Sequence, residues 1–287
     1  MITFTEVADR VFVAVELVVN VNVTLVNGDG RAMLVDTLSH DGQARELLTA
    51  IRSVTPAPLI VVNTHHHYDH AFGNAVVAAG TGGGEPPQDA PVWAHEEAAA
   101  LLRDKGTVLQ RQWYEEILAQ DLEFADALGL CVIRPPDSIV HDEVSLDVGG
   151  RPVTLRHLGR GHTAGDLIVE VPDADLVVAG DLVEEGAPPG FSDAYPMAWP
   201  DTLAGLVARL GPQTKVVPGH GAVVSPEFVR AQHDELSKLS WLIREAHRDG
   251  GDPLKVAARS SLTRFGERGV KEARLAVLRG YEELEQP

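Results

Sequence analysis

The strongest constraint on the fold is a cluster of histidines and an aspartate directly after an apolar segment. Leu59–Val62 leads through Asn63 and Thr64 into the run His-His-His-Tyr-Asp-His at residues 65–70. Four candidate metal ligands therefore occur with the spacing His-x-His-x-Asp-His. Imidazole and carboxylate groups are ligands that Zn²⁺ and similar ions prefer. A loop at the end of a buried strand can hold them on a rigid support, so this stretch predicts a metal site.

Three further candidate ligands follow strand-like segments downstream. His162 lies in a glycine-rich turn between the apolar stretches 152–158 and 167–171. Asp181 and His220 each close a short apolar run and each follow a glycine. The candidate ligand set is then His65, His67, Asp69, His70, His162, Asp181 and His220.

These motifs resemble those of the metallo-β-lactamase superfamily, in which His-x-His-x-Asp-His is followed by Gly-His-Thr, Gly-Asp and Gly-His. All four occur in that order between His65 and His220, and the similar region covers roughly residues 10–225. The resemblance implies a mixed α/β (α+β) fold, an αββα sandwich with the site at one sheet edge. Residues 1–224 would form the catalytic domain, and residues 225–287 would form a helical C-terminal extension packed on the same domain.

The resemblance also implies a role for each ligand. His65, His67 and His162 would hold one metal, and Asp69, His70 and His220 would hold a second. Asp181 would bridge the two, and Asp69 and Asp181 would be the catalytic carboxylates. The expected cofactor is two Zn²⁺, with iron or manganese as alternatives, because geometry and availability decide the metal as much as ligand type does.

Such a site implies a dinuclear zinc hydrolase. Metal binding lowers the pKa of water from about 15.7 to roughly 7, so a hydroxide held between the metals could attack a carbonyl at neutral pH. The expected substrate is a small ester, thioester, lactone or amide. Aspartate at position 181 is similar to the glyoxalase II and lactonase branches, whereas the zinc β-lactamases that use this position usually carry cysteine there.

Alternatives to this hydrolase stay open at the level of the sequence. A mononuclear non-haem iron persulfide dioxygenase has a similar motif set, and β-lactam hydrolysis is a further alternative. A purely structural role for the metal is disfavoured, because structural zinc sites are usually closed sets of four ligands, often rich in cysteine.

Residues around the ligands have their own expected roles. In an extended segment His66 points away from its neighbours, so it is expected to pack and not to ligate. Asp36 is expected to orient a ligand loop. Tyr68, beside the site, and Tyr195 and Trp199, in the apolar loop 182–200, are candidate substrate contacts; the alternative is that the loop residues only anchor the loop. The other histidines are expected at the surface or at helix caps: His40, His95, His141, His157, His233 and His247.

The amino-acid composition indicates which kinds of binding partner are disfavoured. The chain has 24 basic and 42 acidic residues, a net charge of −18, which disfavours binding to nucleic acid or to anionic membranes. It contains no apolar run of about 18 residues, and its start lacks the basic and apolar segments of a secretory leader. The single Cys131 fits a reducing compartment. We therefore expect a cytoplasmic enzyme with a small-molecule substrate, with a homodimer among the open oligomeric states.

The coarse pattern predicts strands in two groups and helices between and after them. Residues 11–62 read mainly as strands with tight turns, and short strands return over residues 140–178. Residues 80–87 are rich in glycine and proline and predict a surface loop. Helices are expected at residues 40–53, 96–103, 107–128, 199–210, 226–248, 253–261 and 270–285.

Overall fold

The computed structural model describes residues 2–83 and 88–285. Residues 84–87 of the predicted surface loop lie outside the described residues. The chain forms two compact units: unit 1 is Met1–His157 with Leu167–Leu176, and unit 2 is Leu158–Asp166 with Val177–Pro287. The predicted division after residue 224 falls inside unit 2 and stays a prediction.

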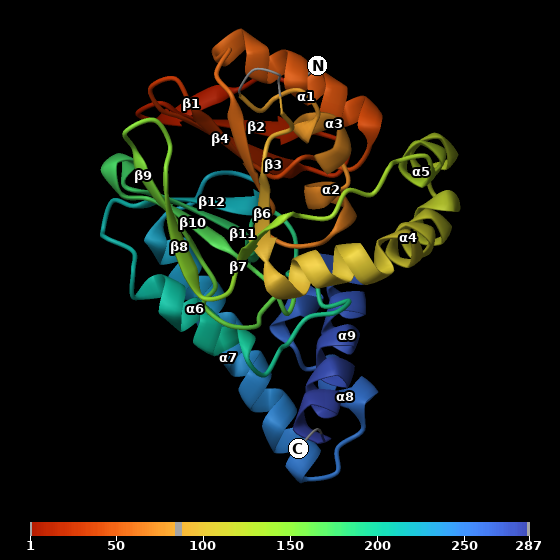
Figure 1. Ribbon diagram of the computed structural model, residues 1–287. Helices are drawn as coiled ribbons and strands as arrows, with labels where there is room; N and C mark the ends of the chain where they lie inside the picture. The colour runs from red at the N-terminus through yellow and green to blue at the C-terminus, as the bar shows by residue number, and fades with distance from the viewer. Residues whose placement is uncertain (1, 84–87, 286–287) are drawn as a thin grey trace. The chain divides into compact units, whose positions relative to one another are not determined.

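Unit 1 contains a sheet that is antiparallel at one side and parallel at the other (Figure 1). The parallel part begins where β4 pairs with β5, with Val35 opposite Val62. Parallel neighbours have their carboxyl ends at the same edge, so the residues that follow β4 and β5 meet there. In spatial order the strands are β1 (Thr5–Ala8), β2 (Val11–Glu16), β3 (Val21–Asn27), β4 (Ala32–Val35), β5 (Leu59–Val62), β6 (Val92–His95) and β7 (Ser138–Val140).

Unit 1 also holds an antiparallel set of strands from the second predicted group. β9 (Pro152–Arg156) pairs with β8 (Glu143–Asp147) on one side and with β10 (Ile168–Val171) on the other. A short 3-10 helix, η1 (Pro172–Ala174), follows β10. The return to short strands after residue 140 is confirmed.

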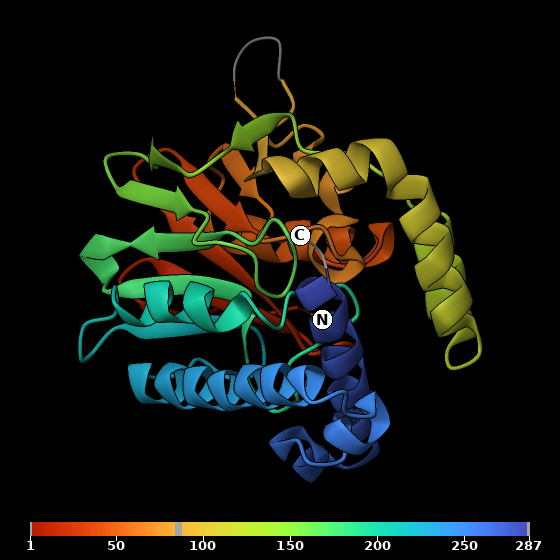
Figure 2. The same cartoon turned by 90° about the horizontal axis from the view of Figure 1, so that it is seen from below.

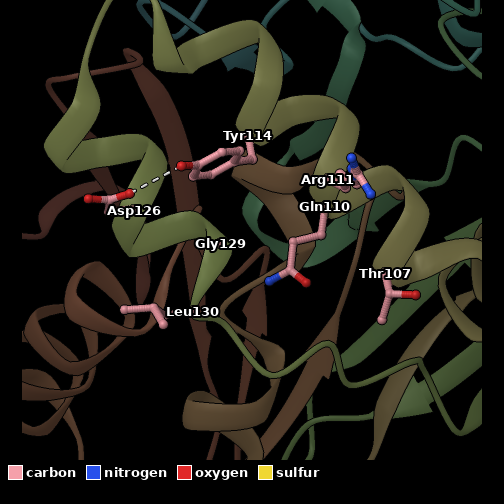
Figure 3. Close-up of a pocket in the computed structure, with 7 residues that line it drawn as sticks. All are labelled: Thr107, Gln110, Arg111, Tyr114, Asp126, Gly129 and Leu130. Carbon is pink, nitrogen blue, oxygen red and sulfur yellow. Dashed lines mark hydrogen bonds between the residues drawn. The ribbon is translucent and has the colours of Figure 1, made fainter.

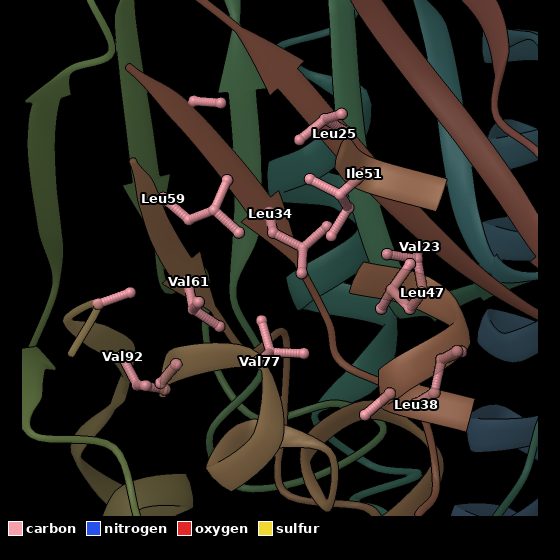
Figure 4. Packing of buried hydrophobic residues seen from close by; sticks show 14 of the residues in the cluster. Val23, Leu25, Leu34, Leu38, Leu47, Ile51, Leu59, Val61, Val77 and Val92 are labelled. Atoms are coloured by element: carbon pink, nitrogen blue, oxygen red, sulfur yellow. The ribbon is translucent and has the colours of Figure 1, made fainter. Parts of the chain in front are cut away.

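The core of unit 1 lies between its sheet and two helices, α1 (Asp41–Val54) and α3 (Asn74–Ala78). Ile51 of α1 lies beside Leu34 of β4, and Leu47 of α1 lies beside Val23 of β3 (Figure 4); all four belong to one buried cluster. Each fully buried aliphatic side chain of this kind contributes about 1.5–3 kcal/mol relative to exposure. The strand ends that carry the candidate ligands therefore rise from a rigid support.

Helices α4 (Glu96–Leu118) and α5 (Leu122–Gly129) lie side by side in unit 1 (Figures 1 and 2). The predicted break near residue 105 is wrong, because α4 continues through Gly106. A Cβ at Gly106 would lie 2.6 Å from Ile133 Cγ2, so the absence of a side chain at this position lets Ile133 pack closely against helix α4. The helix ends instead before Asp121, whose carboxylate caps α5 by accepting a hydrogen bond from the Phe124 amide at 3.0 Å.

A surface cavity of about 440 Å³ lies between α4 and α5 (Figure 3). Tyr114 forms one wall and its hydroxyl donates to Asp126 at 3.4 Å. Gln110 donates to the Leu128 and Cys131 carbonyl oxygens, both at 2.8 Å. Gln110 and Tyr114 thus help to hold α4 against α5 and the residues that follow it.

Unit 2 combines two neighbouring strands, β11 (Leu176–Glu184) and β12 (Lys215–His220), with helices. The helix predicted for residues 226–248 is confirmed as α7 (Pro226–Arg248). Three other predictions differ in their bounds: α6 is Trp199–Val207, α8 is Pro253–Ala257, followed by the 3-10 helix η2 (Ser261–Phe265), and α9 begins earlier, at Gly266–Glu285. Helix α7 packs against both α6 and α9. Among the described residues, no helix combines the length and apolarity needed to span a membrane.

Candidate metal centre

The first four candidate ligands gather at the end of β5 in unit 1. The chain leaves β5 at Val62 and enters the short helix α2 (Tyr68–Ala71), so the ligand run occupies the turn and the first helical residues. The ring centroids of His65 and His70 are 4.2 Å apart, and those of His65 and His67 are 4.6 Å apart. A carboxylate oxygen of Asp69 lies 3.7 Å from Nε2 of His70. All four side chains belong to residues that are buried.

Asp36, directly after β4, holds this ligand turn. One carboxylate oxygen accepts a hydrogen bond from the Thr64 amide, and the other accepts one from the Thr64 hydroxyl, each at 2.8 Å. The second oxygen also lies 2.8 Å from Nδ1 of His70. Burial raises the pKa of the Asp36 carboxyl, against the opposing effect of His70. This arrangement agrees with the prediction that Asp36 orients a ligand loop.

A buried amide network holds the backbone of the same turn. Asn63 Nδ2 and Thr37 Oγ1 both donate to the His70 carbonyl oxygen, at 3.2 and 3.1 Å. Asn63 Nδ2 also donates to Asn74 Oδ1, which lies 2.9 Å from Thr37 Oγ1 as an alternative acceptor for its single hydroxyl hydrogen. Sequence reasoning missed this network. The only available signal was the occurrence of polar residues at the carboxyl ends of two adjacent apolar strands.

The other three candidate ligands meet within unit 2. One carboxylate oxygen of Asp181 lies 3.4 Å from Nε2 of His162 and 3.4 Å from Nε2 of His220. A Cβ at Gly219 would lie 1.7 Å from the other oxygen of Asp181, so only glycine fits beside this carboxylate. This contact explains in physical terms why a glycine precedes His220.

His162 is held from its other ring nitrogen. Nδ1 lies 3.2 Å from the carbonyl oxygen of Gly190, and the Gly190 amide donates to Glu184 Oε1 at 3.0 Å. Glu184 is buried, and burial together with the charge of Asp181 raises its pKa to about 8. Sequence reasoning did not single out Glu184. Its place at the end of an apolar strand, three positions after the candidate ligand Asp181, could have marked it as a functional residue.

The hydrogen bonds at Nδ1 fix the ligating nitrogen of two histidines. A backbone carbonyl and a carboxylate accept hydrogen bonds, so His162 and His70 carry their hydrogen on Nδ1. The lone pair of each neutral ring is then on Nε2, the nitrogen near Asp181 or Asp69. Metal-binding histidines are usually oriented in this way by an oxygen acceptor. The described residues thus include nitrogen and oxygen groups that could hold a metal ion, and their chemistry fits zinc, iron or manganese.

The candidate substrate contacts lie in three different environments. Tyr68 is half-buried, and its ring packs against Trp113 with 4.8 Å between centroids. Tyr195 is half-buried, with the guanidinium of Arg160 4.6 Å from its ring centroid. Trp199 is fully buried and its Nε1 donates to the Leu182 carbonyl oxygen at 3.2 Å, which favours the anchoring role for this residue.

Two of the remaining histidines are helix caps, as predicted. Nδ1 of His40 accepts from the Gly42 amide at the start of α1, and Nδ1 of His95 accepts from the Glu97 amide at the start of α4. The ring of His95 also stacks on that of His157, with 3.9 Å between centroids. His66 is buried beside His67, with 4.8 Å between ring centroids.

Comparison with known proteins shows that the similarity to this superfamily covers most of the chain and not only the ligand motifs. The model of the metallo-beta-lactamase superfamily matches residues 17–220. A metallo-beta-lactamase type 2 from Bacteroides fragilis is 25% identical over 238 residues, which are 79% of this chain and 82% of the relative. The acyl-coenzyme A thioesterase MBLAC2 from Gallus gallus is 27% identical over 212 residues, which are 69% of this chain and 72% of the relative.

Solved structures resemble the chain in fold. A metallo-beta-lactamase from Pontibacter korlensis has a TM-score of 0.65 at 22% identity, covering 83% of this chain and 99% of that one. The FIM-1 metallo-beta-lactamase from Pseudomonas aeruginosa, in its mono-zinc form, has a TM-score of 0.63 at 19% identity, covering 83% and 96%. These likenesses confirm the predicted fold class.

Proposed function

The chain belongs to the metallo-beta-lactamase superfamily, a superfamily of metal-dependent hydrolases, and on that premise we propose that it is a dinuclear zinc hydrolase of small carbonyl compounds. The proposed ligands of the first metal are His65, His67 and His162. Those of the second would be Asp69, His70 and His220, and Asp181 would contact both metals.

The placement of Asp181 carries this proposal. One of its oxygens is equally distant, at 3.4 Å, from Nε2 of His162 and Nε2 of His220, the proposed ligands of different metals. That distance is long for a hydrogen bond between nitrogen and oxygen, which is usually about 2.9–3.0 Å. Two ligand atoms bound at about 2.0–2.1 Å around a tetrahedral zinc lie roughly 3.3–3.4 Å apart. The spacing therefore suits a carboxylate that would bind metal together with both imidazoles, as a shared ligand would.

Residues of the chain would orient the metal ligands and the attacking water. When bound, two divalent ions would supply Lewis acidity and a water nucleophile of lowered pKa. Asp36 fixes the tautomer of His70, and the Gly190 carbonyl does the same for His162. We assign to Asp69 the orientation of the attacking water and the acceptance of its proton. The hydrolysed bond would be the one between the carbonyl carbon and its oxygen, sulfur or nitrogen leaving group.

Thioesters, esters and lactones are the substrates that we propose first. One relative is named an acyl-coenzyme A thioesterase, and Asp181 stands where zinc β-lactamases usually carry cysteine. β-Lactam hydrolysis is the second candidate, because other relatives are named metallo-beta-lactamases. The alternative of a mononuclear iron persulfide dioxygenase makes a different prediction, namely oxygen consumption without hydrolysis.

Hydrolysis of a panel of simple substrates tests the proposal. An aryl ester, a short acyl thioester, a lactone and a cephalosporin would be offered to the wild-type protein, to Asp181→Ala and to Asp234→Ala, an exposed aspartate on α7. Metal catalysis contributes several kcal/mol, and each 1.36 kcal/mol is a tenfold change in rate. We expect Asp181→Ala to lose at least about 100-fold in kcat/KM on the preferred substrate and Asp234→Ala to match the wild type. Equal rates for all three proteins would contradict the proposal.

A further inference from the structure

The C-terminal helix α9 is joined to the candidate metal ligand His162 by a short chain of hydrogen bonds. We propose that Glu272 of α9 is a positioning residue for His162, acting through the peptide that links Gly190 to Phe191. This inference rests on the proposed function, in which His162 binds a metal. It assigns the helical extension a role in holding the metal centre.

The last link of the chain is the contact between Gly190 and His162. The Gly190 carbonyl oxygen lies 3.2 Å from Nδ1 of His162 and fixes both the tautomer and the plane of the ring. A Cβ at Gly190 would lie 3.3 Å from Cε1 of the same ring, so the backbone approaches the imidazole closely. A small shift of this peptide would therefore move the ring or break its hydrogen bond.

Two buried acidic side chains, 88 residues apart in the sequence, hold the amides on either side of Gly190. Glu184, at the end of β11, accepts a hydrogen bond from the Gly190 amide at 3.0 Å. Glu272, on α9, accepts one from the next amide, that of Phe191, at 2.8 Å. Only 5% of Glu184 and 9% of Glu272 is exposed. Burying two acidic side chains is costly unless they are hydrogen-bonded, so both are committed to these consecutive amides.

Side-chain packing fixes the same segment. Phe191 is fully buried, and its ring centroid lies 5.3 Å from that of Trp199. The Trp199 ring lies 5.6 Å from the His162 ring and is anchored by its bond to the Leu182 carbonyl oxygen. The packed Phe191 side chain keeps this segment in the core of unit 2. The hydrogen bond from the Phe191 amide to Glu272 then orients the peptide group whose carbonyl oxygen contacts His162.

Helix α9 also offers a matched control. Glu283 makes the same kind of bond, accepting from the Met197 amide at 2.9 Å. Met197 belongs to the same loop but lies further along it from the Gly190 carbonyl that holds His162. Loss of Glu283 should therefore weaken the attachment of α9 to the loop and leave the His162 ring in place.

The test is the affinity of the metal-free 287-residue protein for Zn²⁺, measured by competition with a chromophoric chelator. Loss of a group that orients a ligand typically weakens metal binding 10–100-fold, and we expect about tenfold for Glu272→Ala. Glu272→Gln should restore most of the affinity, because its amide oxygen still accepts a hydrogen bond from Phe191. Glu283→Ala should bind Zn²⁺ within about twofold of the wild type.

Thermal unfolding of each metal-free protein reports the loss of stability separately. If Glu272→Ala does not fold, Glu272→Asp takes its place, since its shorter side chain keeps the charge but not the reach.

The outcomes separate this inference from the proposed function. Weaker Zn²⁺ binding in Glu272→Ala or Glu272→Asp, with rescue by Gln and no change in Glu283→Ala, supports it. Equal Zn²⁺ affinities for the Glu272 variants and the wild type overturn it and leave the proposed function standing. Equal losses in the Glu272 and Glu283 variants also overturn it, because they indicate a general effect of α9. Failure of the wild type to bind Zn²⁺ overturns the proposed function together with this inference.

Discussion

A carboxylate oxygen of Asp36 lies 2.8 Å from Nδ1 of His70, and both side chains are buried. The same carboxylate holds the amide and the hydroxyl of Thr64, immediately before the first ligand. One side chain therefore fixes a proposed metal ligand and the backbone that presents the others. Because its contacts are all within unit 1, this support belongs to the strand ends of the parallel sheet.

Replacement of Asp36 by alanine should weaken metal binding without removing any proposed ligand. We expect Zn²⁺ affinity to fall about 10–100-fold, as is typical when the acceptor behind a metal-bound histidine is lost. Asp36→Asn keeps one oxygen acceptor and should fall between alanine and the wild type. Chelator competition on the three proteins provides the measurement. An unchanged affinity in Asp36→Ala would show that His70 needs no such support.

Alanine at position 219 should disrupt the site through a steric clash. Its Cβ would lie 1.7 Å from an Asp181 oxygen, so either the carboxylate or the strand end must move. We expect lower metal content and a lower unfolding temperature. Gly205→Ala is the matched control, because its Cβ would meet only ordinary contacts at 3.8 Å or more and helix α6 gains up to about 1 kcal/mol from alanine. Similar metal content in both variants would contradict the proposed place of Asp181.

His95 should make the protein less stable as the pH falls. Burial and the stacked His157 lower the pKa of His95 from 6.5 to about 4. The unfolded chain then binds more protons than the folded one at pH 4–6.5, so the free energy of unfolding decreases as pH falls through this window. Above pH 6.5 both states carry neutral His95, and the group has no effect on the pH dependence.

Urea unfolding of the metal-free protein at pH 7 and pH 5 measures this effect. His95→Asn keeps an oxygen that can cap α4 and should show a smaller drop in unfolding free energy between the two pH values. His247→Asn, which changes a partly exposed histidine on α7, is the control and should behave as the wild type does. An identical pH dependence for all three proteins would argue against a buried neutral His95.

Local patterns predicted a mixture of strands and helices, whereas the αββα sandwich was implied by the family resemblance. The prediction that six histidines lie at the surface or at helix caps likewise rested on local sequence. Apolar runs that end in His or Asp mark strand ends, and His40 and His95 precede the helices that they cap. The break predicted near residue 105 failed because a glycine in a helix can be present for packing, here against Ile133, and not for termination.

The residues that hold the candidate ligands in place could not be predicted from local sequence patterns. Glu184 and Glu272 are 88 positions apart, and each looks like an ordinary acidic residue until both are found on adjacent amides. Asn63 and Asn74 likewise become a network only when the turn between them folds back. Contacts of this kind depend on tertiary packing, which no local pattern in one sequence reports.

Elemental analysis of the protein purified without added metal tests the central claim most directly. Metal content is normalised per chain for the wild type and for Asp181→Ala. We predict close to two zinc ions per wild-type chain and clearly less in the variant, since Asp181 is proposed to bind both. About one iron and little zinc per chain would contradict the dinuclear hydrolase and favour the iron oxygenase.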